Sequence, residues 1–174
     1  HLDGQPALDL VRLMRLTKAL AGERDFCEYA SLAVDRALPG EAKSTIEEGF
    51  ATGVVSKSSR AVNEVLTLAT SRIPADRASI SVSEKAANAP GATGKPAAGA
   101  GDAYLGYGED AKAIPFYKMA LQKGSVDADQ VNTRLGIALA RSGQKDEARK
   151  YLSAVGGVRT DIAKYWLLYV DLLP

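Results

Sequence analysis

The chain has 174 residues, 46% of them hydrophobic and 25% charged, which suits one soluble domain or a short array of stacked units. Lys and Arg total 22 against 21 for Asp and Glu, so no global field favours nucleic acid or an anionic membrane. Cys27 is the single cysteine and His1 the single histidine, which excludes an intramolecular disulfide and leaves few metal ligands. We therefore expect no metal, no cofactor and no nucleic-acid partner.

The start of the chain and its apolar runs bear on processing and membrane insertion. The sequence begins at His1 instead of a methionine, which indicates a processed or excised piece of a longer protein. No apolar run reaches the roughly 18 residues that a membrane-spanning helix needs, so no membrane insertion is expected. The absence of cysteine pairs fits either a reducing or an oxidising compartment.

Helical periodicity runs along the whole chain, and no segment alternates with a period of two for long enough to predict a strand. In the first helix, the apolar stripe leaves Arg12, Arg15 and Lys18 on the polar side. Pro74 is expected to end one helix and to begin another, because a proline disfavours helical conformation in the preceding residue. The expected helices cover 6–21, about 24–37, 39–51, a stretch from Val62 to Pro74, 74 to about 89, 97–107, 110–123, 127–141, 144–155 and 160–172. The predicted fold is all-α, with about ten helices.

The stretch richest in Gly, Pro and Ala lies at 88–101, and its residues 91–96 are the predicted flexible joint. This joint separates degenerate helical repeats at 1–90 from two better repeats and a capping helix at 97–174. The two parts are expected to form one continuous solenoid.

Two stretches of the second half match at a spacing of 35 residues. The matched pairs are Gly101 with Gly136, Gly108 with Gly143, Ala113 with Ala148, Tyr117 with Leu152, and Ala120 with Val155. A period between 20 and 50 residues is typical of solenoids and other repeat arrays. Going back by one and two further periods reaches Ala78 and Ala42, so a register of small residues spans most of the chain.

The residue types at the matched positions predict closely packed helix pairs. In the earlier copy, Gly101 leaves a bare helix face that Ala113 is expected to meet, and Gly108 takes the left-handed conformation at the turn. Tyr117 is expected to fill the space toward the next pair. In the later copy the same roles are expected of Gly136, Ala148, Gly143 and Leu152.

These residues resemble the tetratricopeptide repeat, whose pattern runs from a Trp through Leu-Gly and Tyr to a small Ala, an aromatic, another Ala and a Pro. The matching residues are Leu135 and Gly136 in the later copy, and Tyr104, Ala113, Tyr117 and Ala120 in the earlier one. The departures are Ala97 or Asn132 at the Trp, Ser125 or Thr160 at the Pro, and Leu152 and Val155 near the end. The resemblance implies a superhelical solenoid of antiparallel helix pairs.

The order of segments also resembles bacterial envelope-associated tetratricopeptide proteins of undefined function. This likeness favours the periplasm or envelope over the cytoplasm as the location. The family further implies a concave groove, lined by one face of each first helix, that binds a peptide or helix of another protein. The candidate groove residues are Asp102, Leu105, Gln130, Thr133, Ile137 and Arg141, with ordinary packed or solvated positions as the alternative explanation.

Other candidate sites have simpler explanations. Cys27 has no basic neighbour fixed by sequence that would activate it as a nucleophile. The pair Glu109-Asp110 is expected at a helix start, where the helix dipole favours negative charge, and Glu47-Glu48 on a solvated face. Three tyrosines are expected to be core aromatics and not a ligand platform, namely Tyr104, Tyr107 and Tyr117. No catalytic residue is predicted.

The function expected from these patterns is that of a non-catalytic scaffold for protein-protein interaction. One alternative is a helical accessory domain of a larger envelope enzyme or of a secretion or assembly machine, with the chemistry located elsewhere. Another is a structural homo-oligomer stacked end to end through the apolar last helix, which contains Trp166.

Overall fold

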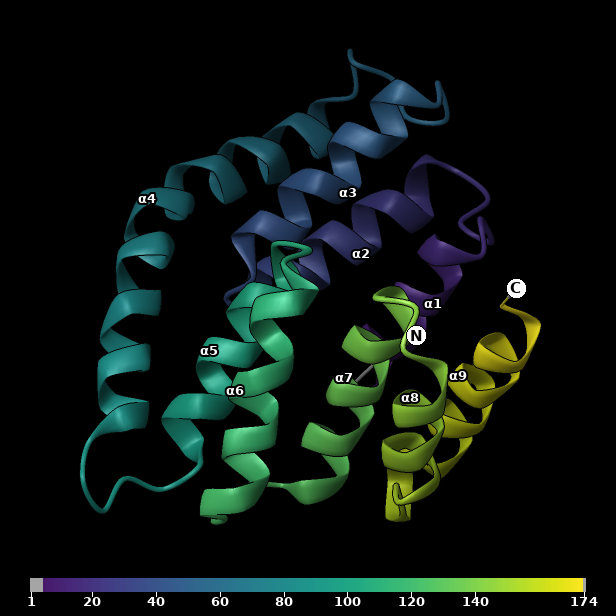
Figure 1. Cartoon of the computed structure of the whole chain (residues 1–174). Helices are drawn as coiled ribbons and strands as arrows, with labels where there is room; N and C mark the ends of the chain where they lie inside the picture. The colour runs from purple at the N-terminus through teal and green to yellow at the C-terminus, as the bar shows by residue number, and fades with distance from the viewer. Residues whose placement is uncertain (1–4, 174) are drawn as a thin grey trace. The chain divides into compact units, whose positions relative to one another are not determined.

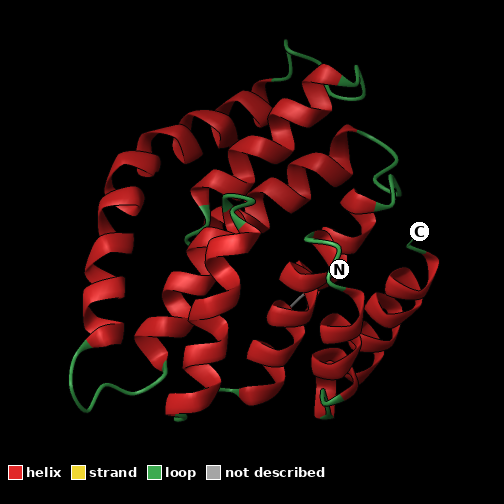
Figure 2. Cartoon of the chain, viewed as in Figure 1, coloured by secondary structure: helices red, strands yellow, loops and turns green. Residues whose placement is uncertain are grey.

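The computed structural model describes residues 5–173, and within that range it contains helices and loops but no strand (Figure 2). The predicted all-α class is confirmed for this part of the chain, while His1 lies outside it. Nine α-helices and one short 3₁₀ helix of the described chain pack sequentially in adjacent pairs (Figure 1). Their bounds are α1 Gln5–Leu16, α2 Glu23–Asp35, α3 Pro39–Ala51, α4 Arg60–Asn88, α5 Lys95–Gly106, α6 Asp110–Lys123, α7 Ala128–Arg141, α8 Lys145–Ser153, η1 Gly157–Arg159 and α9 Thr160–Leu172.

The chain divides into two compact units, and the boundary lies between Ser79 and Ile80. This division falls inside α4, and the predicted joint at 91–96 belongs to the second unit. Gly94 of that joint is buried, and its N–H donates a hydrogen bond to the carbonyl of Gly124 at 2.8 Å. A Cβ at Gly94 would overlap the backbone carbonyl of Ala120, so only glycine allows the start of α5 to lie this close to the end of α6.

In the first unit, α2 and α3 lie side by side and enclose a hydrophobic core with residues of α1 and α4 (Figure 1). Helix α2 carries Glu23 and Asp25 in its first turn, where their charges complement the helix dipole, and α3 has Pro39 in its first turn. The fully buried members of this core are Ala30, Ala33, Ala42, Ile46, Val62 and Ala69.

Helix α4 has 29 residues and continues through Pro74, so the prediction that Pro74 ends a helix is wrong. Pro74 lacks the N–H that would bond the carbonyl of Thr70, yet both residues are exposed, so water can satisfy that carbonyl. Because two expected helices are one, the described chain has nine α-helices where about ten were expected.

In the second unit, α5 packs on α6, α7 packs on α6 and α8, and α9 packs on α8 and α7. Helix α7 contacts neighbours on several sides, and its residues from Thr133 to Ala140 are all buried. No helix in the described range is long and apolar enough to cross a membrane.

The turns within three helix pairs share one conformation. The left-handed residue is Ala37 between α2 and α3, Gly108 between α5 and α6, and Gly143 between α7 and α8, with φ values of 56°, 73° and 74°. In each turn the next N–H donates to a carbonyl five residues earlier at 2.9 Å, which closes the helix as a Schellman motif. The donor and acceptor residues are Leu38 and Ala33, Glu109 and Tyr104, and Gln144 and Leu139. The predicted roles of Gly108 and Gly143 are thereby confirmed.

Candidate functional site

The two pairs of helices in the second unit are held together by equivalent close contacts at glycine. A Cβ at Gly101 would lie 2.8 Å from Cδ1 of Tyr117, and a Cβ at Gly136 would lie 2.7 Å from Cδ2 of Leu152. The predicted close approach is confirmed, but the nearest atoms belong to Tyr117 and Leu152 and not to the expected alanines. Both large side chains are fully buried and fill the space within their own helix pair.

The register of small residues holds at three of its four positions. Ala42, Ala113 and Ala148 are fully buried in the second helix of a pair, where a larger side chain would push the two helices apart. Ala78 instead lies exposed on α4, so the prediction of a packed small residue there is wrong. Its position belongs to a single long helix that has no paired second helix in this segment.

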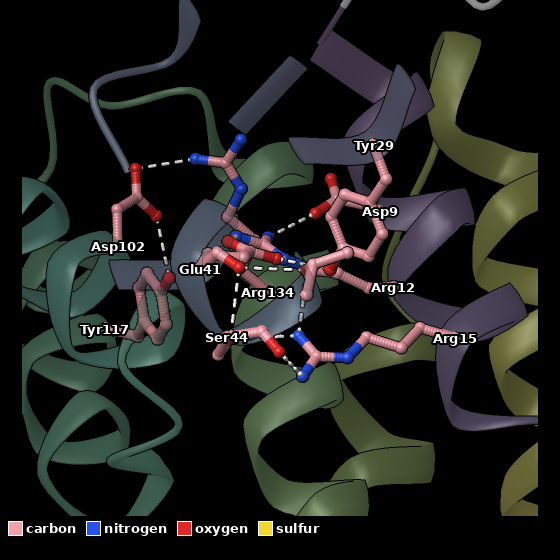
Figure 3. Close-up of polar contacts among 10 residues, drawn as sticks. Asp9, Arg12, Arg15, Tyr29, Glu41, Ser44, Asp102, Tyr117 and Arg134 are labelled. Carbon is pink, nitrogen blue, oxygen red and sulfur yellow. Dashed lines mark hydrogen bonds and ion pairs between the residues drawn. The ribbon is translucent and has the colours of Figure 1, made fainter. Parts of the chain in front are cut away.

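Asp102 joins three helices of the second unit (Figure 3). From α5, its Oδ1 accepts a hydrogen bond from the Tyr117 hydroxyl of α6 at 2.7 Å, and its Oδ2 lies 2.6 Å from Nη1 of Arg134 on α7. The Arg134 side chain is only 5% exposed, so its charge is largely removed from water and a paired carboxylate stabilises it there. This arrangement aligns the first helices α5 and α7 with one another.

The six predicted groove residues differ in accessibility. Leu105, Thr133 and Ile137 are buried, and Thr133 donates its hydroxyl hydrogen bond to the backbone carbonyl of Asp129 at 2.6 Å. Asp102, Gln130 and Arg141 are partly exposed, and Arg141 forms an ion pair with Asp110 at 3.1 Å. A ligand on this face could therefore contact the three partly exposed residues but not the three buried ones.

Two aspartates near the start of α7 have structural roles that were not predicted from the sequence. Asp127 caps the helix, because its Oδ1 accepts the Gln130 N–H at 3.0 Å. Asp129 accepts the Gly156 N–H at 2.9 Å and so fixes the segment that leads into α9. An aspartate directly before an apolar helical stretch is a recognisable capping signal, whereas the contact to Gly156 has no local sequence signal.

A second polar cluster is buried in the first unit, around Arg12 of α1 (Figure 3). Its Nε and Nη2 donate to the two carboxylate oxygens of Glu41 at 2.7 and 2.6 Å, and its Nη1 donates to Asp9 at 2.9 Å. The Tyr29 hydroxyl donates to Glu41 at 2.6 Å. All four residues are less than 5% exposed, so the prediction that Arg12 lies on a polar outer face is wrong. The buried face of a helix is predicted from the spacing of its apolar residues alone. An arginine that is buried through ion pairs with distant residues is therefore assigned to the polar face.

The cluster shifts the protonation equilibria of its own members. Burial lowers the pKa of Arg12, but the charge and hydrogen bonds of Glu41, with Asp9 and Tyr29, outweigh burial and raise this pKa well above its usual value. Burial and the charge of Glu41 raise the pKa of Tyr29 well above that of a free tyrosine. The guanidinium and the phenol thus keep their protons, and the cluster serves to hold α1 on α3.

The rim of this cluster continues the attachment of α1 to α3. Arg15 lies 2.6 Å from Glu48 and donates to the hydroxyls of Ser44 and Thr45, and Lys18 lies 2.7 Å from the other oxygen of Glu48. Burial raises the pKa of Glu48, but the hydrogen bonds from Lys18 and Arg15 outweigh this effect and lower it. Glu48 is therefore an ion-pair partner and does not simply lie on a solvated face.

The remaining candidate residues follow the simpler explanations in most cases. Tyr104 and Tyr117 are buried, the Tyr104 ring stacks on Phe116 with centroids 5.8 Å apart, and its hydroxyl donates to Glu84 at 2.6 Å. The core role of these two tyrosines is confirmed, while Tyr107 is partly exposed. Cys27 is a free, partly exposed thiol at the edge of the first core. Within residues 5–173, no three His, Cys, Asp or Glu side chains are placed to hold a metal ion.

Comparison with known proteins gave no match at the level of a protein family, a curated protein or a solved structure.

Proposed function

We propose that this protein is a non-catalytic interaction module that binds a peptide or helix of another protein. Its second unit would be a short solenoid of tetratricopeptide-like helix pairs, and the first unit would carry one further pair of the same kind. The ligand would lie along the first helices α5 and α7, against Asp102, Gln130 and Arg141.

The observation that carries this proposal is the recurrence of one turn in three helix pairs. Ala37, Gly108 and Gly143 adopt the same left-handed conformation and are followed by the same closing hydrogen bond. Two of these pairs also share the close glycine contact to Tyr117 or Leu152. Proteins built from such recurring pairs commonly act by presenting an extended surface of first helices.

The charges of the two clusters support a structural role in place of catalysis. In the first unit, the Arg12 guanidinium is paired with the carboxylates of Asp9 and Glu41, and in the second unit Arg134 is paired with Asp102. Such pairs position helices, whereas a general acid or base needs a proton that it can exchange with a bound substrate.

Photo-crosslinking from two matched glutamines tests the proposal. Gln130 lies on the first helix α7, and the exposed Gln122 lies on the second helix α6. With a benzoyl-phenylalanine at either position of the full chain in cells of the source organism, we expect a discrete adduct with another protein from position 130 only. Equal adducts from both positions, or no adduct from position 130, would contradict the proposal.

A further inference from the structure

Helix α9 is apolar on two opposite sides. Its inner side places Trp166 and Val170 fully within the protein, so Trp166 offers no surface to a partner. Its outer side leaves Tyr165, Leu168 and Leu172 exposed by 52%, 61% and 84%. Since successive residues of an α-helix turn by about 100°, these three form one stripe along the helix, opposite the buried side.

The charged residues beside this stripe are arranged so that two copies of the helix complement each other. Lys164 precedes the central Leu168 by about one turn, and Asp171 follows it by nearly one turn on the same flank. Their side chains are 67% and 58% exposed. Two α9 helices that run antiparallel and cross at Leu168 would bring each Lys164 beside Asp171 of the other copy.

We propose that α9 forms a two-fold antiparallel contact with α9 of a second copy of this chain. Leu168 packs on its own equivalent at the two-fold axis, and Tyr165 packs on Leu172 of the other copy at both ends of the stripe. The two Lys164 to Asp171 pairs flank the apolar contact and fix its antiparallel direction. A parallel two-fold arrangement would instead place the charged flanks of the two helices on opposite sides of the contact, so that neither Lys164 nor Asp171 would meet an opposite charge of the other copy.

The arrangement of charges on α9 favours a second copy of this chain, and not an unrelated helix, as the partner. An isologous contact requires that one surface be complementary to itself, and opposite charges on the same flank at matching distances from Leu168 meet that requirement. Within its own chain, Lys164 forms an ion pair with Asp161 at 3.3 Å, and Asp171 forms one with Arg149 at 2.9 Å. Both ion pairs lie at the surface, where such pairs contribute little, so a second copy can compete for these charges. This inference uses a surface other than the Gln130 face and goes beyond the proposed function.

One helix from each copy makes an interface smaller than the standard size of about 1,600 Å², so we expect a weak and reversible dimer. Sedimentation velocity of the full chain between about 5 and 500 µM should show a mass that rises from monomer to dimer. Leu168→Asp should remain monomeric over this range with an unchanged circular dichroism spectrum, while Val82→Asp, at an exposed apolar position of α4, should dimerise like the wild type.

A charge exchange distinguishes this contact from other modes of association. Lys164→Asp and Asp171→Lys should each weaken dimerisation at least tenfold, because each variant places like charges together. An equimolar mixture of the two variants should dimerise again, since every charge then meets its opposite in the heterodimer. No recovery in the mixture, or a wild-type chain that stays monomeric, would overturn the proposal.

Disulfide trapping keeps the proposal testable if a charge variant fails to fold. In a Cys27→Ser background, Leu168→Cys places two thiols at the two-fold axis, and Val82→Cys is the exposed control. Under mild oxidation we expect Leu168→Cys to form a covalent dimer at least tenfold faster than the control. Equal rates would overturn the proposed geometry.

Discussion

Arg12 of α1 donates two hydrogen bonds, of 2.7 and 2.6 Å, to the carboxylate of Glu41 of α3, although the two residues lie 29 positions apart in the chain. Both side chains are almost completely buried. The first helix is therefore attached by charge as well as by the apolar contacts of Leu8 and Val11. Removing one member of such a pair leaves an uncompensated charge in the core.

Arg12→Met is expected to destabilise the protein by about 3–5 kcal/mol, because Asp9 and Glu41 lose their common partner. Arg24→Met should leave the stability nearly unchanged, since the Arg24 side chain is 86% exposed and forms its ion pair with Glu28 of its own helix. Urea unfolding gives both values. A loss below about 1 kcal/mol for Arg12→Met would show that the buried network contributes little.

The ion pairs of Glu48 predict a loss of stability in acid. The lowered pKa of Glu48 means that the folded state favours the carboxylate, so its contribution is complete above the unfolded pKa of about 4.3. The contribution disappears as the pH falls through the lower pKa of the folded state. Glu48→Gln should therefore flatten the decline in melting temperature below about pH 4.5, and the exposed Glu47→Gln serves as the control. A wild-type slope in Glu48→Gln would contradict this assignment.

The glycine contact in the pair α7 and α8 predicts a position where even a methyl group is harmful. Gly136→Ala should destabilise by about 1–3 kcal/mol, because the new Cβ overlaps Leu152. Gly99→Ala should instead stabilise by about 0.5–1 kcal/mol, since Gly99 lies in α5 with open space around its Cα. In a Leu152→Ala background the cost of Gly136→Ala should shrink, and a double-mutant cycle measures that coupling.

The shared turn predicts opposite effects at equivalent residues. Ala37 occupies the left-handed position that glycine occupies in the two other turns, at a cost of about 1–2 kcal/mol. Ala37→Gly should therefore stabilise by about 0.5–1 kcal/mol after the greater chain entropy of glycine is subtracted. Gly143→Ala should destabilise by about 1 kcal/mol. If both changes destabilise equally, the three turns do not share the same energetics.

Local patterns sufficed for the all-α class, for the helices other than α4 and for the turn glycines of the second unit. Gly108 and Gly143 are recognisable because their residue type and the helix periodicity point to the same conformation. Pro74 misled the prediction, because the sequence does not reveal that Pro74 and Thr70 both lie on an exposed side of the helix. Ala37 was missed for the opposite reason, since alanine gives no sign that it adopts a left-handed turn.

The polar clusters could be predicted only in part. Asp9 and Arg12 are spaced as an i,i+3 pair on a helix, but the decisive partner Glu41 is distant in sequence. The six groove residues came from a family register, which places residues on a face of a helix without saying how deeply they are buried. Leu105, Thr133 and Ile137 are buried because of tertiary packing, which no local pattern contains.

The bond from Gly94 to Gly124 joins the start of α5 to the end of α6, while the turn at Gly108 joins their other ends. The helices α5 and α6 are thus connected to each other at both ends of the pair, so neither end can fray independently of the other helix. We expect the Gly94 amide to exchange its hydrogen only when the whole pair opens, at a rate close to that of the buried amides of α6. Helix ends ordinarily exchange fastest, so slow exchange at Gly94 would mark this pair as one cooperative unit.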